Sequence, residues 1–328
     1  MIVIFSDHTD QSTNEIIDWL HHFKAPFIRV NEDSFIDSYS MLVSNSDTSY
    51  TLTAGSAGGW AGGNTNVWYR RGGFKLTPQR ITALDGFTSY EKKSLQAQLD
   101  LEVECATEAI GSVVFSGSIN SPFENQLNKI NVLRVAVECG LSIPETLITN
   151  ERKEVLSFKR KHQTIITKNI AQGVYAKVSG ASYGGFTTTC TSRFLNSLPT
   201  RFPSSLFQPL IPKWLDLRSF YLDGELFTSA IFSQVDKRTR IDFRNYNKER
   251  PNRCPPFRIP TEVKYKIRAL MSSIGLRSGS IDMILTPSGE YVFLEVNPVG
   301  QFKQVSYPCN FKLEKRIAET LIHQHEKD

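Results

Sequence analysis

The feature that most constrains this sequence is a pair of apolar segments separated by a short turn, within residues 279–302. Residues 281–285 and 291–297 are rich in β-branched and aromatic side chains, and a Pro-Ser-Gly turn lies between them. This pattern is typical of an antiparallel β-hairpin. Both segments are apolar on both faces, which is characteristic of buried strands. The sequence therefore predicts a hairpin inside a packed sheet.

Three metal-competent side chains interrupt this apolar pattern. Because side chains alternate between the two faces of a strand, Glu295 and Asn297 share one face, and the turn brings Asp282 opposite Glu295. Solvent-facing acids on an ordinary hairpin are the alternative, but a buried acid needs a partner. Carboxylate and amide oxygens without nitrogen or sulfur ligands favour Mg²⁺ over zinc. We therefore interpret Asp282, Glu295 and Asn297 as a Mg²⁺ site.

At this hairpin the sequence resembles the ATP-grasp superfamily, whose last strands carry an Asp and then Glu-x-Asn-Pro, matched here by Asp282 and residues 295–298. The sequence also resembles a narrower group, the grasp-with-spasm peptide maturases, which include the microviridin-type ligases. The segments that carry this resemblance are FLEVNPVGQF, the WYRR segment at residues 68–71 and the N-terminal MIVIFSDHTDQSTNEIIDWL. The resemblance implies ATP and Mg²⁺ as cofactors and a ribosomal precursor peptide as the substrate.

The predicted architecture is α/β. Strands at residues 2–5 and 27–30 flank a helix whose start is indicated by a Ser12-x-x-Glu15 capping box, which gives a β-α-β unit. The resemblance implies an ATP-grasp fold with an N-terminal pre-grasp domain at residues 1–120, a central lobe at 121–205 and a C-terminal lobe at 206–328. The nucleotide is expected between the last two.

Several segments of the first 140 residues have two interpretations. The glycine-rich residues 53–64 lack the Gly-Lys-Ser/Thr of a phosphate loop, so a flexible connector is favoured. Arg70 and Arg71 end a strand, where they either face a site or are an exposed basic pair. Helical periodicity predicts one helix over residues 90–110 and another over 124–139.

The residues expected to bind nucleotide follow largely from the resemblance. Lys168 ends an apolar strand at residues 165–168 and is assigned to phosphate. Lys129 is the second phosphate candidate, although a surface charge on a helix is an equal alternative. Asp216 is assigned to the ribose hydroxyls, with a solvated ion pair as the alternative. The backbone expected to meet adenine is the inter-lobe hinge, with candidates Gln208, Leu210 and Ile211.

Two arginines are the candidates for contact with the acyl phosphate or the substrate carboxylate. Arg218 shares a predicted strand face with Asp216, and Arg244 belongs to a run in which Arg240, Asp242 and Arg244 alternate with apolar residues. This alternation predicts a strand with one charged face. Residues 174–190 predict a hairpin that clamps either nucleotide or peptide.

Composition excludes several other classes of protein. A net charge of +5 over 328 residues, without a clustered basic face, gives no support for nucleic-acid binding. No run approaches the roughly 20 apolar residues that cross a bilayer, and no secretory leader is visible, so the cytoplasm is expected. The five scattered cysteines predict free thiols, and the dispersed histidines predict surface residues.

The predicted function is an ATP-dependent ligase that activates Asp or Glu side chains of a precursor peptide as acyl phosphates. The activated carboxyl would then be joined to Thr or Ser hydroxyls, or to Lys amines, to form macrocycles. A RimK-like ligase that adds an amino acid to a protein or small molecule is one alternative, and a nucleotide-binding scaffold with a decayed site is another. The sequence leaves the oligomeric state open, with a homodimer as one candidate.

Overall fold

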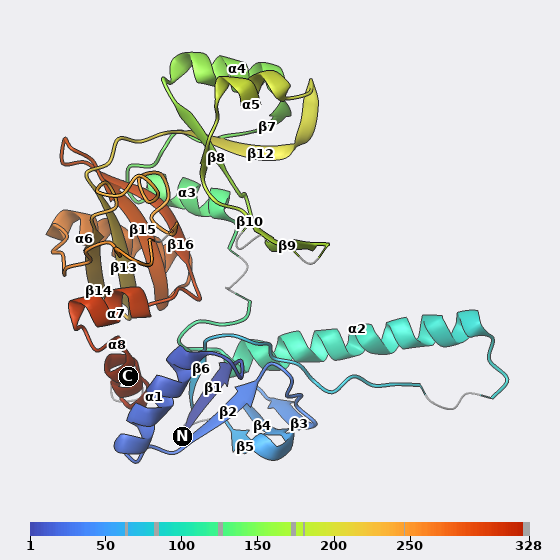
Figure 1. The fold of residues 1–328 in the computed structure, drawn as a ribbon. Coiled ribbons are helices and arrows are strands. Elements are labelled where there is room, and N and C mark those ends of the chain that lie inside the picture. The colour runs from blue at the N-terminus through green and yellow to red at the C-terminus, as the bar shows by residue number, and fades with distance from the viewer. Residues whose placement is uncertain are drawn as a thin grey trace. The chain divides into compact units, whose positions relative to one another are not determined.

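The computed structural model describes residues 1–62, 65–81, 85–123, 127–171, 175–179, 181–245 and 247–323, and the chain divides into two compact units (Figure 1). Unit 1 consists of Met1–Gln126 together with Lys312–Asp328, and unit 2 consists of Leu127–Phe311. The finer division into domains at residues 120 and 205 stays a prediction. No helix of the described residues is both long enough and apolar enough to span a bilayer.

Unit 1 is built on a parallel sheet in which β1 (Ile2–Ser6) lies between β2 (Phe27–Asn31) and β6 (Asn66–Tyr69). Helix α1 (Gln11–His22) connects β1 to β2, so the predicted β-α-β unit is confirmed. The predicted capping box is wrong. Asp10 caps this helix by accepting a hydrogen bond from the Thr13 N–H at 2.9 Å, because the helix starts before Ser12.

A second, antiparallel sheet in unit 1 contains β3 (Ser38–Val43), β4 (Thr48–Ala54) and β5 (Gly58–Ala61). The prediction of a flexible connector is therefore wrong for residues 53–61, while residues 63 and 64 lie outside the described part. The reason is local. Gly55 and Gly58 adopt φ of 43° and 106°, which lets the chain reverse direction and pair β5 with β4.

Helix α2 (Ser89–Val114) starts at a capping box between Thr88 and Glu91, and it extends the predicted helix at both ends. Its buried residues are all at its C-terminal end: Ile110, Gly111 and Val114. Helix α8 (Leu313–Ile322) packs against α1 and β6, so the last helix of the chain belongs to unit 1.

Unit 2 contains a four-stranded sheet in the order β11-β8-β12-β7. Its strands are β11 (Thr188–Thr189), β8 (Ile165–Lys168), β12 (Arg201–Pro209) and β7 (Leu147–Glu151). Helices α4 (Arg152–Lys161) and α5 (Ser192–Ser197) supply Val155, Phe158 and Leu195 to the core on this sheet. Antiparallel strands β9 (Tyr175–Val178) and β10 (Ala181–Gly184) form the predicted hairpin.

The other sheet of unit 2 has the order β14-β13-β15-β16 and is antiparallel throughout. It consists of β14 (Glu225–Ile231), β13 (Leu215–Leu222), β15 (Ser278–Leu285) and β16 (Tyr291–Asn297). The predicted buried hairpin is therefore confirmed as β15 and β16.

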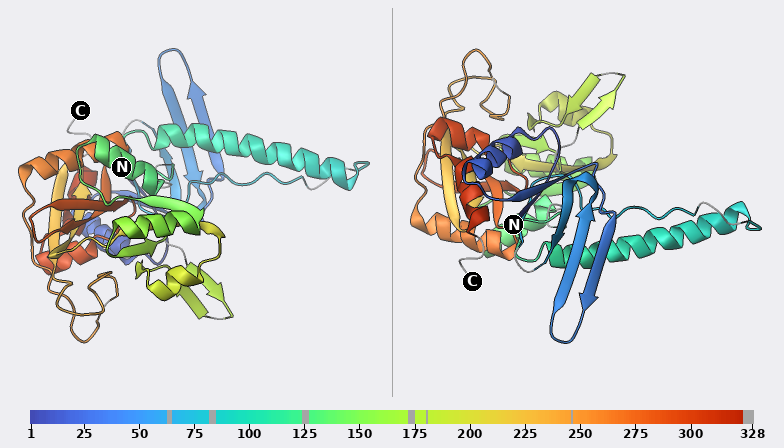
Figure 2. Two further views of the ribbon diagram at one scale, coloured as in Figure 1. Left: turned by 90° about the horizontal axis from the view of Figure 1, so that it is seen from above. Right: turned by 90° about the horizontal axis from the view of Figure 1, so that it is seen from below.

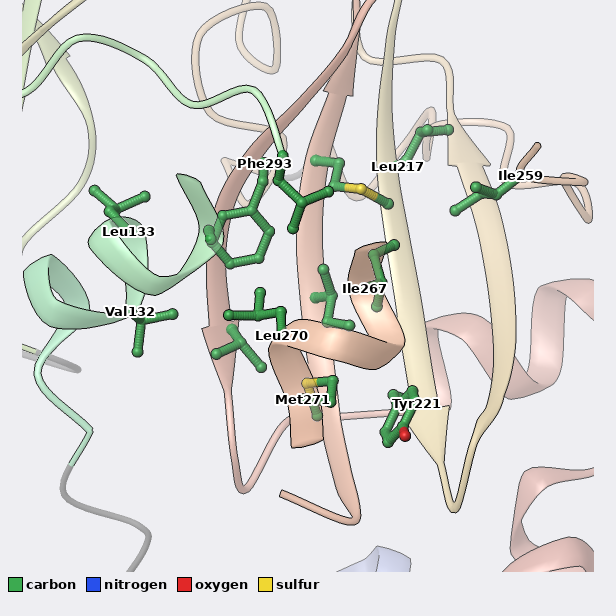
Figure 3. Packing of buried hydrophobic residues seen from close by; sticks show 14 of the residues in the cluster. Val132, Leu133, Leu217, Tyr221, Ile259, Ile267, Leu270, Met271 and Phe293 are labelled. Atoms are coloured by element: carbon green, nitrogen blue, oxygen red, sulfur yellow. The ribbon is translucent and has the colours of Figure 1, made fainter. Parts of the chain in front are cut away.

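Helices on this sheet complete the main core of unit 2. Helix α3 (Lys129–Glu138) and helix α6 (Thr261–Ser273) contribute apolar side chains that pack among those of β13, β15 and β16 (Figure 3). Helix α7 (Lys303–Cys309), which the periodicity did not indicate, packs on β13 and β14. The predicted helix over 124–139 starts at Lys129 in the structure, with Asn128 as its cap, and residues 124–126 lie outside the described part.

Candidate functional site

The strand register places the candidate metal ligands opposite one another. On β15 and β16, Asp282 pairs with Glu295 and Ser280 pairs with Asn297, so the predicted opposition of the two acids is confirmed. Asp282 also lies opposite Arg218 of β13. The central strand β15 therefore holds its carboxylate between a cation on one side and a second carboxylate on the other.

Asp282 and Arg218 form a buried ion pair. The Arg218 Nη1 donates to both Asp282 carboxylate oxygens, at 2.8 and 2.6 Å. Burial raises the pKa of Asp282 above its usual value, the Arg218 charge opposes that rise, and the neighbouring Glu295 carboxylate adds to it. The predicted role of Arg218 beside an anionic group is compatible with this position, but its partner here is the candidate metal ligand.

Glu295 lies among lysines from two other elements. The Lys129 Nζ on α3 lies 2.9 Å from Glu295 Oε2. Burial alone would raise the pKa of Glu295, but the charges of Lys129 and Lys168 outweigh it, so the pKa lies below its usual value. Burial lowers the pKa of Lys168, and the Glu295 carboxylate opposes that effect. The two lysines that were assigned to phosphate, Lys129 and Lys168, thus both face the Glu295 carboxylate.

Asp216, the candidate for ribose binding, is already paired. The Lys213 Nζ donates to both of its carboxylate oxygens, at 2.9 and 2.8 Å, and the Ser233 hydroxyl donates to Oδ2. Burial raises the pKa of Asp216, and Lys213 opposes the rise. The alternative of a solvated ion pair does not hold, because Asp216 is 3% exposed. Sequence reasoning missed Lys213 and Ser233. The signal that could have indicated Lys213 was its position three residues before a buried acid.

Arg244 is not on a strand, so the predicted charged strand face at residues 240–244 is wrong. These residues form turns, because the Asp242 carboxylate accepts a hydrogen bond from the backbone N–H of Arg244 at 3.0 Å and holds the chain in a bend. The Arg244 side chain donates to the same carboxylate at 2.9 and 2.6 Å. Arg240 instead donates to the Gln234 carbonyl.

The three hinge candidates lie where β12 ends. Gln208 is buried, and its Nε2 donates to the Thr146 Oγ1 at 2.8 Å. The Leu210 N–H donates to the Thr164 carbonyl at 2.9 Å, and Ile211 follows it. This segment runs from the β12 sheet toward β13 of the other sheet, which is the position that the hinge assignment requires.

Arg70 and Arg71 belong to unit 1, where both contact Asp10. Arg70 is 4% exposed, with its Nε 3.2 Å from Asp10 Oδ2, so the interpretation as an exposed basic pair is wrong for this residue. The Arg71 Nε lies 2.8 Å from the same oxygen. Burial alone would raise the pKa of Asp10, but the two arginines and the backbone N–H of Thr13 together hold it below its usual value.

The chemistry of the cluster in unit 2 suits a hard divalent cation. Asp282, Glu295 and Asn297 offer only oxygen ligands, and the strand pairing sets the two carboxylates side by side. Lys129 and Arg218 neutralise these carboxylates in the structure with two positive charges, which is the charge of one Mg²⁺. The residues present therefore fit the predicted metal.

Comparisons with known proteins identify the fold. Macrocyclase MdnC from Microcystis aeruginosa MRC, bound with precursor peptide MdnA, is 26% identical with a TM-score of 0.72, covering 98% of this chain and 100% of MdnC. A RiPP-associated ATP-grasp ligase from Chryseobacterium gregarium, in complex with ADP and a leader and core peptide, is 20% identical with a TM-score of 0.77, over 100% of this chain and 97% of that one. ATP-grasp ligase PsnB, complexed with minimal precursor, Mg and ADP, is 17% identical with a TM-score of 0.65, over 98% and 96%.

These likenesses confirm that the chain is an ATP-grasp ligase with the predicted α/β fold. Within that class, its neighbours are the ligases associated with ribosomal peptides, so the resemblance to peptide maturases is confirmed as well. A RimK domain protein from Sphaerobacter thermophilus DSM 20745 is more distant, at 11% identity and a TM-score of 0.51. No protein-family model matches the sequence, and no curated protein matches it significantly.

Proposed function

We propose that this protein is an ATP-dependent macrocyclase that joins side chains of a ribosomal precursor peptide. It activates an Asp or Glu carboxylate as an acyl phosphate, which a Thr or Ser hydroxyl or a Lys amine then attacks, forming an ester or an amide. The observation that carries the proposal is the opposed pair Asp282 and Glu295, with Lys129, Lys168 and Arg218 facing it, in the fold of MdnC.

The main obstacle in this reaction is the repulsion between an anionic carboxylate and an anionic phosphate. ATP supplies the phosphoryl group, and Mg²⁺ held by Asp282, Glu295 and Asn297 would reduce its negative charge. The residues of this chain do the rest by positioning. Lys129 and Lys168 bind phosphate oxygens as fixed cations, which stabilises the charge that develops during transfer.

The ion pairs in the structure add one feature to this proposal, which is that Lys129 and Arg218 would change binding partners when the metal binds. Lys129 and Arg218 occupy the carboxylates that the metal would use. With a metal ion held by these oxygens, Lys129 would be free to bind the phosphates and Arg218 to bind the acyl phosphate or the substrate carboxylate. Arg244, which pairs with the Asp242 carboxylate in the structure, has the same proposed role as Arg218. The carboxylates are never left buried without a countercharge, which would be costly.

The adenine and the ribose of the nucleotide are assigned to the hinge and to Asp216. The backbone of Gln208, Leu210 and Ile211 would meet the adenine, and the Asp216 carboxylate would accept from the ribose hydroxyls. Since Lys213 and Ser233 already bind that carboxylate, ribose binding requires Asp216 to share its lone pairs with them. The protein would act in the cytoplasm, where its ribosomal substrate is made.

The experiment is to incubate the protein with ATP, Mg²⁺ and a candidate precursor, meaning a short peptide rich in Thr, Asp and Glu that is encoded next to it, and to measure the peptide mass and the nucleotide products. We expect the loss of one water and the release of one ADP per link. A matched peptide with its acceptor Asp and Glu changed to Asn and Gln should stay unmodified. AMP and pyrophosphate, or equal modification of the matched peptide, would overturn the mechanism. Growth of the peptide mass by an added amino acid would favour the RimK-like alternative.

A further inference from the structure

The segment between β14 and α6, residues 232–260, carries a concentration of positive charge. It contains eight basic residues and three acidic ones, and this surplus of five equals the net charge of the whole chain, so the remainder of the chain is neutral. The spacing of these basic residues fits neither a helix nor a strand, so no basic face is apparent from the sequence alone. Figure 2 shows the segment, in tan and orange, as loops that extend away from the β14-β13-β15-β16 sheet.

Two of the three acids hold the fold of this segment. Asp236 accepts a hydrogen bond from the Arg238 backbone N–H at 2.8 Å and another from the Asn247 side-chain amide at 2.6 Å. The Asp242 carboxylate accepts from both the backbone and the side chain of Arg244. Acids that bond to the nearby chain in this way fix turns. Most of the negative charge of the segment is therefore used within the segment itself.

Seven of the eight basic residues are not used in this way. They are all exposed: Lys237, Arg238, Arg240, Lys248, Arg250, Arg253 and Arg258. Within the described part of the chain, Arg244 is the one basic residue of the segment that forms an ion pair, whereas Arg240 contacts the Gln234 carbonyl and Arg253 the Phe232 ring. Like charges gathered without countercharges repel one another, which costs stability. The cost is recovered when an anionic partner binds.

The same segment is bonded to the candidate site. The Lys213 Nζ, which donates to both carboxylate oxygens of Asp216, also donates to the Ile241 carbonyl at 3.2 Å. The Ser233 hydroxyl, near the start of the segment, donates to Asp216 as well. Arg244 lies close enough to the candidate metal site for its charge to act on both of the carboxylates there. The loop that carries the exposed cations therefore joins directly onto the residues assigned to carboxylate activation.

The chemistry of the segment favours a peptide over a nucleic acid as the anionic partner. Proteins that bind single-stranded nucleic acid combine basic residues with exposed aromatic rings on which the bases stack. In this segment Phe243 is buried and Phe232 and Phe257 are half-buried, while residue 246 lies outside the described part. A substrate that brings a carboxylate to the adjoining site, by contrast, carries the complementary charge by its own chemistry.

We propose that residues 232–260 form a docking surface for an acidic peptide, whose Asp and Glu side chains pair with the exposed arginines and lysines before one of them enters the site. This inference rests on the proposed function for the identity of the peptide, and it adds the surface that attracts the peptide. Attraction between opposite charges raises the rate of encounter and weakens as salt increases. The exposed cations should therefore affect peptide binding and not the chemical step.

The test is fluorescence anisotropy, which needs no turnover, with a labelled synthetic peptide in which Glu alternates with Thr and a second peptide with Gln in place of Glu. In the full-length protein, the triple variant Arg238→Gln, Lys248→Gln, Arg250→Gln should bind the Glu peptide about tenfold more weakly at low salt, and this difference should shrink as salt increases. The Gln peptide should bind the parent protein and the variant with the same low affinity. With a precursor that the protein ligates, KM should rise in the variant while kcat stays unchanged.

The matched control is the triple variant Arg160→Gln, Lys161→Gln, Arg193→Gln, which removes the same charges from exposed residues of α4 and α5. It should bind the Glu peptide within about twofold of the parent affinity. Equal losses in the two triple variants, or a Glu peptide that binds no better than the Gln peptide, would overturn the inference. Tighter binding of a single-stranded oligonucleotide than of the Glu peptide would overturn it as well. A protein that binds the Glu peptide through these residues but modifies no precursor would support the docking surface and count against the ligase mechanism.

Discussion

The buried carboxylates of unit 2, Asp216, Asp242 and Asp282, each pair with a basic side chain that a neighbouring strand or a bend of the chain places beside them. Arg218 meets Asp282 because adjacent strands pair those two positions, and Lys213 meets Asp216 because the chain bends just before β13. Removing one member of a buried pair leaves the other uncompensated, whereas removing both together costs much less. The stability of this region should therefore depend on pairs rather than on single side chains.

Asp282→Ala should lower the free energy of unfolding by about 3 kcal/mol, because it leaves the Arg218 guanidinium buried and unpaired. Combining it with Arg218→Met should recover most of the loss. The measurement is unfolding in urea. Glu138→Ala is the control, since its ion pair with Arg134 is largely exposed and should contribute less than about 1 kcal/mol. An equal loss in Asp282→Ala and Glu138→Ala would contradict this reading of the pair.

The sequence allowed some of these residues to be predicted and not others, for a physical reason. Asp282 and Glu295 interrupt strands that are otherwise apolar, so both could be singled out from the sequence. The structure sets them opposite each other through a register shift between Asp282 and Met283, which the alternation of side chains does not indicate. For Lys213 the only signal was its spacing of three residues from Asp216, and Ser233 carries none, because its contact with Asp216 depends on how two strands and a loop meet in space. Their possible roles in nucleotide binding, and those of all the site residues, stay predictions.

Among the elements, the β15–β16 hairpin depends on a close approach just beyond its last strand. A Cβ atom added to Gly300 would lie 2.5 Å from the Ser280 backbone nitrogen on β15. No real Cβ atom tolerates that distance, so the loop that follows Asn297 must keep a glycine here or move away. The side chain of Asn297 would move with it.

Gly300→Ala should therefore weaken the binding of ADP in the presence of Mg²⁺ and lower stability by about 1–3 kcal/mol, the usual cost of overpacking. Calorimetric titration measures the first effect. Gly289→Asn is the control, because that residue sits in the hairpin turn with φ of 87° and open space around it, and Asn tolerates this conformation. Equal ADP affinity in the two variants would show that the Gly300 contact does not position the site.

The elements that sequence reasoning missed share a cause. Residues 53–61 contain several glycines, which suggested a connector, yet two positive φ angles there create a strand pairing. Residues 240–244 alternate polar and apolar side chains as a strand does, yet Asp242 bonds to the local backbone and bends the chain. In both segments a contact between a few atoms overrides the pattern of hydrophobicity.

At the scale of the whole molecule, unit 1 is discontinuous in sequence, since it takes its last helix from beyond unit 2. Three large apolar side chains of α8 are almost fully buried: Leu313, Ile317 and Leu321. Each buried side chain of this size contributes roughly 1.5–3 kcal/mol. The helix is therefore a structural part of unit 1 and not an appendage.

A chain truncated after Phe311 should lose the stability of unit 1 while unit 2 keeps all of its residues. Limited proteolysis followed by mass spectrometry should find new cleavage sites within residues 1–126 and few within 127–311. A chain ending at His323 is the control and should be cut like the parent. Equal new cleavage in both units would show that α8 supports the molecule as a whole.

The position of α8 also has a consequence for biosynthesis. The ribosome synthesises all of unit 2 before it makes the helix that covers α1 and β6. The first unit to begin synthesis is thus the last to be completed. Its apolar surface stays uncovered while about 185 residues are translated, which takes roughly 10–40 seconds at about 5–20 residues per second. We therefore expect that premature termination anywhere in unit 2 leaves that surface exposed to proteases, and that a stable ligase requires a chain that includes α8.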